Sequence, residues 1–420
     1  MFTFSRIRDN HELENDRVQG YLRSDGRKGI RNVVVIAYLV ECAHHVAKTI
    51  VSQVNDPDVQ LIGFPGCYPN DYALQMMKRL CTHPNVGGVV LVSLGCEGFN
   101  REDLEKTIKE SGRPVETLVI QKTGGTTSTI KQGVIHAKTI LAAAQQVKAV
   151  NMRISELVIG TICGGSDGTS GISANPAVGI CFDKLIEQDA TCIFEETGEL
   201  IGCEHIMKKR AETPELGHKL LECVEKAEKY YTKMGYGSFA PGNAEGGLTT
   251  QEEKSMGAYA KSGASLISGI IIPGEIPSKK GLFLMDVVPD GEPTFGFPNI
   301  SDNAEIVEMI ASGCHLTLFT TGRGSVVGSA ISPVIKICAN PYTYHNLSDD
   351  MDVNAGTVID GTKSVEEVGQ EIFELVVDVA QGKESKSEAL GHKEFILTYK
   401  HFDSNQSDNT NIEFSPVCGA

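Results

Sequence analysis

The chain of 420 residues contains no tryptophan, and aromatic residues make up only 6% of it. It has no apolar run of about 18 residues, and its first residues are charged throughout, so neither a membrane span nor a signal peptide is predicted. Basic residues are also scarce: 38 Lys and Arg stand against 54 Asp and Glu, a net charge of −16. This balance argues against nucleic acid or an anionic membrane as a partner. We predict an acidic cytoplasmic protein.

Several common signatures are absent. Twelve cysteines are too few for a disulfide scaffold in a chain of this length. The sequence has no phosphate-binding G-x-x-x-x-G-K-[ST] loop and no H-E-x-x-H helix. Gly322-Arg-Gly324 is followed by glycine one residue too late for a dinucleotide-binding loop. Nucleotide-dependent and zincin-type functions are therefore not favoured.

The first part of the chain alternates short β-branched runs with amphipathic stretches. Strands are predicted over residues 33–40, 59–64, 89–94 and 117–120, with helices over 43–54, 71–81, 102–111 and 127–150. Nearly continuous apolar strands that alternate with helices indicate a parallel sheet covered on both faces. We predict an N-terminal α/β domain over residues 20–155, built as a doubly wound parallel sheet.

Two further α/β units are predicted after it. A block over residues 156–235 starts with a strand at 157–162, a glycine-rich loop at 163–173 and a helix at 175–188. A turn-rich linker at 235–247 leads to a C-terminal α/β domain over 248–400, with strands near 265–272, 282–286 and 315–320 and a helix at 364–380. Residues 401–420 are polar and without periodicity, which predicts a disordered tail.

A cysteine follows each of four predicted strands. These residues are Cys42, Cys67, Cys96 and Cys163. In a doubly wound sheet the carboxyl ends of parallel strands lie along one edge, where ligands bind. The pattern predicts that cysteines far apart in sequence are neighbours in space.

Thiolates favour iron, zinc and iron–sulfur clusters, and three of them leave a coordination position open for a substrate. We interpret Cys42, Cys67 and Cys96 as a metal or cluster site, with Cys163 as a fourth candidate. The structural alternative is that these are buried core thiols, because free cysteine is often buried. A role as a core residue is preferred for Cys81, Cys181, Cys192, Cys203, Cys223, Cys314 and Cys338. Cys418 is interpreted as a thiol of the C-terminal tail.

Glycine-rich loops follow other predicted strands. They begin at Lys122 (K-T-G-G-T), at Cys163 (C-G-G-S-D-G) and at Thr320 (T-T-G-R-G-S). Backbone N–H groups in such turns form anion sites, and Lys122 and Arg323 add positive charge suited to a carboxylate. Ordinary tight turns are the alternative explanation. Acid–base candidates by residue type are Asp25, His44, His45, Glu97, Asp167, Glu196, Glu204 and His205.

A series of motifs resembles the altronate/galactarate dehydratase family. The segment beginning at Asp25 (D-G-R-K-G-I-R-N) is similar to the family's opening motif. The resemblance continues in the family's order through residues 95–97, 122–126, 164–176, 196–205, 241–248, 320–324 and 350–356. Together these motifs cover the chain from about residue 20 to 395, which is far more specific than any one of them.

The resemblance implies iron-dependent dehydration of a sugar acid. An α-proton is removed beside a carboxylate, the β-hydroxyl leaves, and the resulting enol becomes a 2-keto-3-deoxy acid. Such chemistry needs a metal on the leaving oxygen, fixed donors for the carboxylate, and a general base. Candidate bases are His45, Lys122, Asp167 and His205. Residues expected to bind substrate are Arg27, Arg31, Asn32, Thr126, Ser166, Asn175 and Arg323.

Two departures from the family pattern affect partner and substrate. Many single-chain relatives carry a small SAF-like β-rich module before the D-G-R segment, whereas about 20 residues precede it here. We therefore expect a separate small subunit and an oligomeric enzyme acting on a small hydroxycarboxylate. Residues 41–45 (E-C-A-H-H) also differ from the family's usual N-C-S.

Three alternatives stay open. The first is the large subunit of a sulfolactate sulfo-lyase, which expels sulfite by an analogous elimination; residues 333–341 and 391–395 are similar to that branch. The second is a non-catalytic iron-binding scaffold or sensor subunit. The third is a metal-free protein that binds hydroxy acids.

Overall fold

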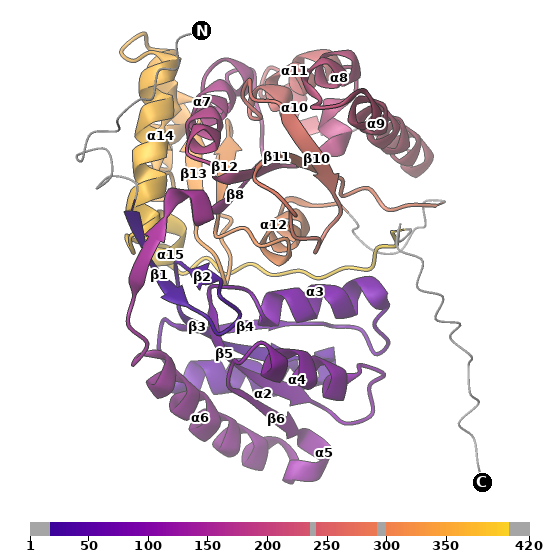
Figure 1. The fold of residues 1–420 in the computed structure, drawn as a ribbon, viewed down its shortest axis with the longest axis vertical. Coiled ribbons are helices and arrows are strands. Elements are labelled where there is room, and N and C mark those ends of the chain that lie inside the picture. The colour runs from indigo at the N-terminus through magenta and orange to yellow at the C-terminus, as the bar shows by residue number, and fades with distance from the viewer. Residues whose placement is uncertain (1–16, 236–240, 292–299, 403–420) are drawn as a thin grey trace, which may run out of the picture.

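The structure, a computed structural model, describes residues 17–235, 241–291 and 300–402. Figure 1 shows two stacked halves, with the N-terminal sheet and its helices below and a larger sheet above. Three sheets are formed in the described residues: a four-stranded, a seven-stranded and a small three-stranded one. The predicted α/β class is confirmed.

The N-terminal half is a four-stranded parallel sheet in the order β4-β3-β5-β6. Its strands are the apolar runs that the sequence predicts, because a strand covered on both faces needs no polar alternation. Helices α2 and α6 contribute to the core on one face, and α3 and α4 to the core on the other. The elements are β3 (Val33–Tyr38), α2 (Glu41–Val54), β4 (Val59–Gly63), α3 (Asp71–Cys81), β5 (Val86–Ser93), α4 (Arg101–Glu110), β6 (Val115–Val119), α5 (Ile120–Thr123) and α6 (Gly125–Ala144).

One predicted helix ends early. The expected helix over 127–150 ends at Ala144, and strand β7 (Val150–Arg153) follows it. β7 pairs antiparallel with β1 (Arg17–Leu22), which also pairs with β2 (Lys28–Gly29). The partners of β7 lie far away in sequence, so its local pattern did not reveal a strand.

The C-terminal half is a seven-stranded parallel sheet in the order β10-β11-β9-β8-β12-β13-β14. The strands are β8 (Val158–Cys163), β9 (Thr191–Phe194), β10 (Ile267–Ile271), β11 (Gly281–Met285), β12 (Leu316–Thr321), β13 (Val334–Cys338) and β14 (Val353–Asn354). The blocks expected separately over 156–235 and 248–400 both contribute strands to this sheet. β8 and β9 thus complete the sheet that the later strands form.

Helices cover both faces of the large sheet. One apolar core contains α7, α9 and α14, and the other contains α12 together with α3 of the N-terminal half. Figure 1 shows α12 between the large sheet and α3, so the two halves share a core. The helices are α7 (Ala174–Glu187), α8 (Glu204–Arg210), α9 (Pro214–Met234), α10 (Pro241–Glu245), α11 (Gln251–Ala260), α12 (Asp302–Ala311), α13 (Pro341–Asn346), α14 (Val365–Ala380) and α15 (Lys386–Leu390).

A buried polar cluster joins the same two halves. Tyr72 of α3 donates a hydrogen bond to Glu308 of α12, and the Lys400 ammonium lies 2.6 Å from the same carboxylate. All three side chains are buried. Lys400 belongs to the final described segment, which runs between the halves (Figure 1).

The strand order creates a crevice in the large sheet. After β8 the chain builds β9, β10 and β11 on one side, then β12, β13 and β14 on the other. The carboxyl ends of β8 and β12 therefore flank a topological switch point, where open α/β sheets bind ligands.

Two remaining expectations concern membrane spans and the C-terminal tail. Among the described residues, no helix combines the length and apolarity needed to span a bilayer. The predicted tail over 401–420 lies outside the described residues except for His401 and Phe402.

Candidate active site

A pocket of about 690 Å³ opens at the switch point of the large sheet. The loops after β8, β9 and β12 form part of its wall, and the start of α12 closes another side. Because these loops all follow parallel strands, their side chains gather at one edge. The lining residues are Cys163, Gly164, Gly165, Ser166, Glu195, Glu196, Gly198, Glu199, Tyr231, Pro241, Gly242, Asn243, Glu245, Lys254, Val287, Ile300, Ser301, Asp302, Glu305 and Arg323.

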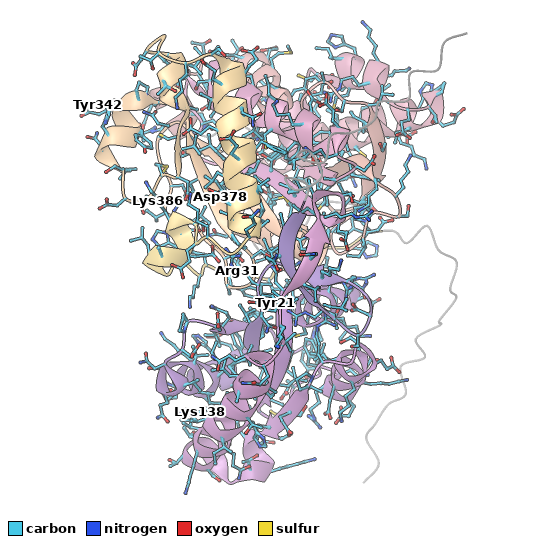
Figure 2. All side chains as sticks on the ribbon, turned by 60° about the vertical axis from the view of Figure 1, so that its left-hand side comes forward. Tyr21, Arg31, Lys138, Tyr342, Asp378 and Lys386 are labelled. Carbon is cyan, nitrogen blue, oxygen red and sulfur yellow. The ribbon has the colours of Figure 1, made fainter. Side chains whose placement is uncertain are left out.

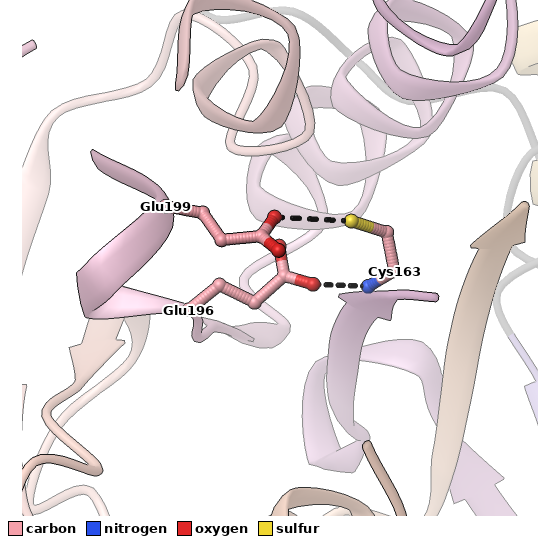
Figure 3. Close-up of side chains that lie close together, drawn as sticks. All are labelled: Cys163, Glu196 and Glu199. Atoms are coloured by element: carbon pink, nitrogen blue, oxygen red, sulfur yellow. Dashed lines mark hydrogen bonds between the residues drawn. The ribbon is translucent and has the colours of Figure 1, made fainter. Parts of the chain in front are cut away.

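Cys163, Glu196 and Glu199 form a compact group in this pocket. Figure 3 shows Cys163 at the end of its strand, facing the two glutamates. The Cys163 Sγ lies 3.2 Å from Glu199 Oε2, and Ser166 Oγ donates to the same sulfur at 3.1 Å. Within the described residues, this is the one group of three cysteine, histidine or carboxylate side chains whose ligand atoms all lie within 4.8 Å of one another.

Glu196 is held in an unusual conformation. Its φ of 81° lies in the left-handed region, which costs a non-glycine residue about 1–3 kcal/mol. The Cys163 backbone N–H and the Lys261 ammonium both donate to its carboxylate. These contacts fix the carboxylate against the end of β8.

Two buried lysines face the carboxylates. Lys261 pairs with Glu196, and Lys254 of α11 pairs with Glu199. Both lysine side chains are about 97–98% buried. Each lysine gains a partner on folding, and this attraction outweighs burial and raises the pKa of both ammonium groups.

The carboxylates outnumber these lysines. Glu195, Asp302 and Glu305 line the same pocket, so five carboxyl groups share two buried ammonium groups. Burial, and then repulsion from Glu199, raise the pKa of Glu196 to about 7 and that of Asp302 to about 6. The pocket therefore carries more acidic than basic groups, and bound protons or a bound cation can balance the excess negative charge.

One carboxylate oxygen near these groups is buried without a hydrogen-bond partner among the described residues. Glu195 Oε2 is buried and has no hydrogen-bond partner within the described protein. A buried acceptor without a partner is costly, so such an oxygen points to a missing ligand, water or proton. Burial and the charges of Glu305 and Glu196 raise the pKa of Glu195 well above its usual value.

Four of the residues predicted from sequence line this pocket. They are Cys163, Ser166, Glu196 and Arg323. Arg323 donates to the Gly242 carbonyl and lies 3.1 Å from Glu245 at the rim. The glycine-rich loops after β8 and β12 thus contribute to the site as expected.

Asp167 and Asn175 lie nearby in the loop and helix that follow β8. Asp167 accepts hydrogen bonds from Thr169 at one oxygen and from Asn340 at the other. Asn175 donates to the Gly257 carbonyl. Neither residue lines the pocket, and the roles of general base for Asp167 and substrate binding for Asn175 stay predictions.

The arginines of the D-G-R segment hold the protein together instead of lining the pocket. Arg31 forms a two-point ion pair with Glu388 of α15, with N–O distances of 2.7 and 2.9 Å, and donates to the carbonyls of Val379 and Lys383. Figure 2 places Arg31 at the junction of the two halves, close to Asp378 of α14. In this structure Arg31 ties the two halves together, and its role in substrate binding stays a prediction.

Arg27 and Asn32 also form hydrogen bonds to other parts of the protein. Arg27 bonds Asp25 and the Thr82 carbonyl. Asn32 accepts from Arg23 and donates to the Ala144 carbonyl. Neither lines the pocket, and their role in substrate binding likewise stays a prediction.

Four more predicted residues lie outside the pocket. His45 is exposed on α2, Lys122 on α5, Thr126 on α6 and His205 on α8. The first three belong to the N-terminal half, whose sheet is separate from β8 and β12. Their predicted catalytic and substrate-binding roles do not apply to this pocket, because strand-end position alone did not reveal which sheet a loop serves.

The four strand-end cysteines divide between two sheets. Cys42, Cys67 and Cys96 are exposed residues just after β3, β4 and β5, whereas Cys163 ends β8 in the large sheet. The expectation that all four share one edge was wrong for Cys163. The cysteines assigned to the core are buried, apart from the partly exposed Cys223, and Cys418 lies outside the described residues.

Sequence reasoning missed the lysines and the acids of α12. A charged residue on a helix is normally predicted to face solvent, so Lys254, Lys261, Asp302 and Glu305 attracted no notice. One signal existed: Lys254 and Lys261 are seven residues apart, which places them on one side of a helix.

Comparison with known proteins identifies the family. The model described as "D-galactarate/Altronate dehydratase, C-terminal" matches residues 154–402, more than half of the chain. The model described as "D-galactarate dehydratase/Altronate hydrolase, second domain" matches residues 20–145. The chain belongs to the galactarate/altronate dehydratase family. It is therefore an enzyme of the dehydratase type.

Three relatives illustrate the range of this dehydratase family. The chain is 32% identical to the (2R)-sulfolactate sulfo-lyase subunit beta of Chromohalobacter salexigens, over 92% of this chain and 98% of that protein. It is 30% identical to the altronate dehydratase of Bacillus subtilis, over 91% of this chain and 78% of that protein. It is 33% identical to the galactarate dehydratase (L-threo-forming) of Escherichia coli, over 88% of this chain and 74% of that protein.

Four of the family motifs contribute to the pocket. The segments at 164–166, 195–199, 241–243 and around Arg323 all supply lining residues. The segments at 25–32, 95–97, 122–126 and 350–356 do not line it.

Proposed function

We propose that the chain is an iron-dependent lyase that removes a leaving group from the carbon next to the α-carbon of a hydroxycarboxylate. Its first candidate substrate is a sugar acid of the altronate or galactarate type, converted to a 2-keto-3-deoxy acid with release of water. The observation that carries this proposal is a pocket at the switch point of the large sheet to which four family motifs contribute, and whose lining offers one thiol and six carboxyl groups.

The donor set in this pocket fits a borderline-soft divalent metal. Cys163 and Glu199 offer one sulfur and one carboxylate ligand, and the neighbouring Glu196 carboxylate, held by Lys261, stays available for proton transfer. Thiolate ligands favour iron or zinc over magnesium or calcium, and the surplus of carboxylates gives the ion a compensating charge. When bound there, iron would supply Lewis acidity toward the leaving oxygen.

The protein's own residues can supply the proton transfers. In the elimination, a base takes the α-proton, the C–O bond to the β-hydroxyl breaks, and that oxygen leaves as water after gaining a proton. Glu196, whose pKa lies at about 7, can accept or donate a proton near neutrality. Lys261 holds the Glu196 carboxylate in place, and Arg323 at the rim suits the substrate carboxylate.

The test uses anaerobically purified protein supplied with ferrous iron. We expect keto-acid formation from one member of a panel of aldonates and aldarates, and iron bound in proportion to protein. Cys163→Ser and Glu199→Gln should each reduce bound iron and activity together, whereas Cys223→Ser, a change outside the pocket, should leave both intact. Absence of iron and of keto acid with every sugar acid, both with the chain alone and with a small subunit added, would overturn the dehydratase proposal.

One observation favours a second candidate, the large subunit of a sulfolactate sulfo-lyase. The chain is 32% identical to a sulfo-lyase subunit over 98% of that subunit's length. The two segments that resemble the sulfo-lyase branch also touch, because Lys336 Nζ lies 3.2 Å from His392 Nδ1. Under this proposal sulfite leaves in place of water, and a separate small subunit completes the enzyme.

Sulfite separates the two candidates. With sulfolactate as substrate and iron present, the sulfo-lyase releases sulfite, while the dehydratase forms keto acid from a sugar acid without any sulfite. Each assay should be run with the chain alone and with the small subunit added, since a subunit requirement would otherwise be read as inactivity.

A further inference from the structure

Three thiols meet at the carboxyl edge of the N-terminal sheet, away from the pocket. Cys67 follows β4, Cys42 follows β3 and Cys96 follows β5. These strands are adjacent in the order β4-β3-β5, so the three cysteines leave neighbouring strands at the same edge. All three are exposed free thiols, and their side chains are not required for the apolar core.

Backbone hydrogen bonds tie the three cysteine segments together. Gly98 N–H donates to the Cys67 carbonyl at 2.8 Å, which joins the loops after β4 and β5 across the end of β3. Glu41 N–H donates to the Pro65 carbonyl at 3.1 Å, which joins the start of α2 to the loop before Cys67. The loops are therefore held as one unit around the strand ends.

The spacing of the thiols is too wide for a single ion. Thiolates that share one tetrahedral ion lie about 3.8 Å apart, given metal–sulfur bonds of about 2.3 Å. The sulfurs of Cys42, Cys67 and Cys96 are not all within 4.8 Å of one another. In an iron–sulfur cluster each thiolate binds a different iron, which separates the sulfurs further.

The surroundings suit an anionic cluster. Cys42 is the second residue of α2, a helix of 14 residues whose first turn has no side-chain cap. The backbone N–H groups of Glu41 and Ala43 donate to the carbonyls of Pro65 and Val40, and the helix dipole favours negative charge at this end of α2. Below the loops, Phe64 packs against Phe99 and Tyr399 with ring centroids 5.8 and 5.4 Å apart, which gives the site an apolar floor.

We propose that Cys42, Cys67 and Cys96 together bind a cubane iron–sulfur cluster, each thiolate on a different iron. Three protein ligands leave one corner of the cluster open to a small oxygen ligand or to a partner's side chain. This centre is distinct from the group of Cys163, Glu196 and Glu199, which lies in the other sheet. The proposal goes beyond the lyase function and does not depend on it.

The test is anaerobic reconstitution of the full chain with ferrous iron and sulfide. We expect visible charge-transfer absorption and stoichiometric acid-labile sulfide. Each of Cys42→Ser, Cys67→Ser and Cys96→Ser should lose most of both signals. The matched control Cys223→Ser removes a partly exposed thiol elsewhere and should retain them. Iron bound by the three cysteines without sulfide, or a full cluster in the triple serine variant, would overturn the proposal.

Thiol labelling gives a second measurement on the unmodified chain. Before reconstitution all three thiols should react with an alkylating agent, and afterwards all three should be protected together. A disulfide among them, or no change in labelling, would contradict the cluster. Cys163→Ser should keep this protection while losing iron from the pocket, so a failure of the cluster and a failure of the lyase proposal give different results.

Discussion

The buried ion pair between Lys261 and Glu196 should dominate the response to mutation of the pocket. Their side chains are 2% and 4% exposed, and the ammonium donates to the carboxylate. Lys261→Met keeps the length of the side chain but leaves a buried carboxylate without its partner. Loss of one member of a buried pair costs about 3–5 kcal/mol, a large part of a typical stability of about 5–15 kcal/mol.

The cost should depend on pH in a defined direction. The pKa of Glu196 in the folded chain, about 7, already lies above its ordinary value of 4.5, and Lys261 is one of the groups that lowers it. Without Lys261 the pKa rises further, so the folded state binds a proton that the unfolded state releases. That stabilisation is present at low pH and is lost as the pH rises through the folded pKa, so Lys261→Met should be less harmful at about pH 5 than at about pH 8.

Urea unfolding of the wild type and variants at both pH values measures this effect. The double variant Lys261→Met with Glu196→Gln removes both charges and should recover much of the lost stability at the higher pH. Lys279→Met is the control, because its pair with Glu212 is largely exposed and should contribute less than about 1 kcal/mol. An equal loss at both pH values, or a double variant as unstable as the sum of the single ones, would refute the reasoning.

Three further predictions concern Glu196 and Gly164 at the pocket and Arg31 between the two halves. Glu196→Gln should lower kcat by about 10²–10⁴-fold in the keto-acid or sulfite assay, because it removes the group that moves the proton; a near-normal rate would reassign that role. Arg31→Met should lower the free energy of unfolding by about 2–4 kcal/mol through loss of its bonds to Glu388 and backbone carbonyls, with KM unchanged in the folded enzyme; a raised KM would support its predicted role in substrate binding. Gly164→Ala should reduce iron binding and activity, because an added Cβ would lie 2.1 Å from an Asp302 oxygen; metal analysis and the activity assay check both, and unchanged values would show that Asp302 is free to move.

The N-terminal sheet could be predicted from sequence because its strands are continuous apolar runs. A run such as 33–38 has both faces covered, so its pattern is local and strong. The antiparallel pairing of β1 with β7 could not be found in this way, because its partners are more than a hundred residues apart. The union of β8 and β9 with the later strands was hidden for the same reason.

The candidate site was predicted in part. Glycine-rich loops after strands pointed to Ser166 and Arg323, and strand-end position pointed to Cys163. The lysines that balance Glu196 and Glu199 were missed, since burial of a lysine depends on a partner that the local sequence does not show. Arg31 was assigned to the substrate because its charge is visible in sequence while its partner Glu388, 357 residues away, is not.

The sequence by itself determined the α/β class, the strands of the first sheet, the family and the types of chemical group available. Only the tertiary structure decided which of those groups meet: it separated Cys163 from the other three cysteines, placed the two lysines opposite the glutamates, and used the arginines as ties between the halves. The physical reason is that strand and helix periodicity are local properties, whereas burial, charge pairing and ligand geometry arise from contacts between segments that are distant in the chain.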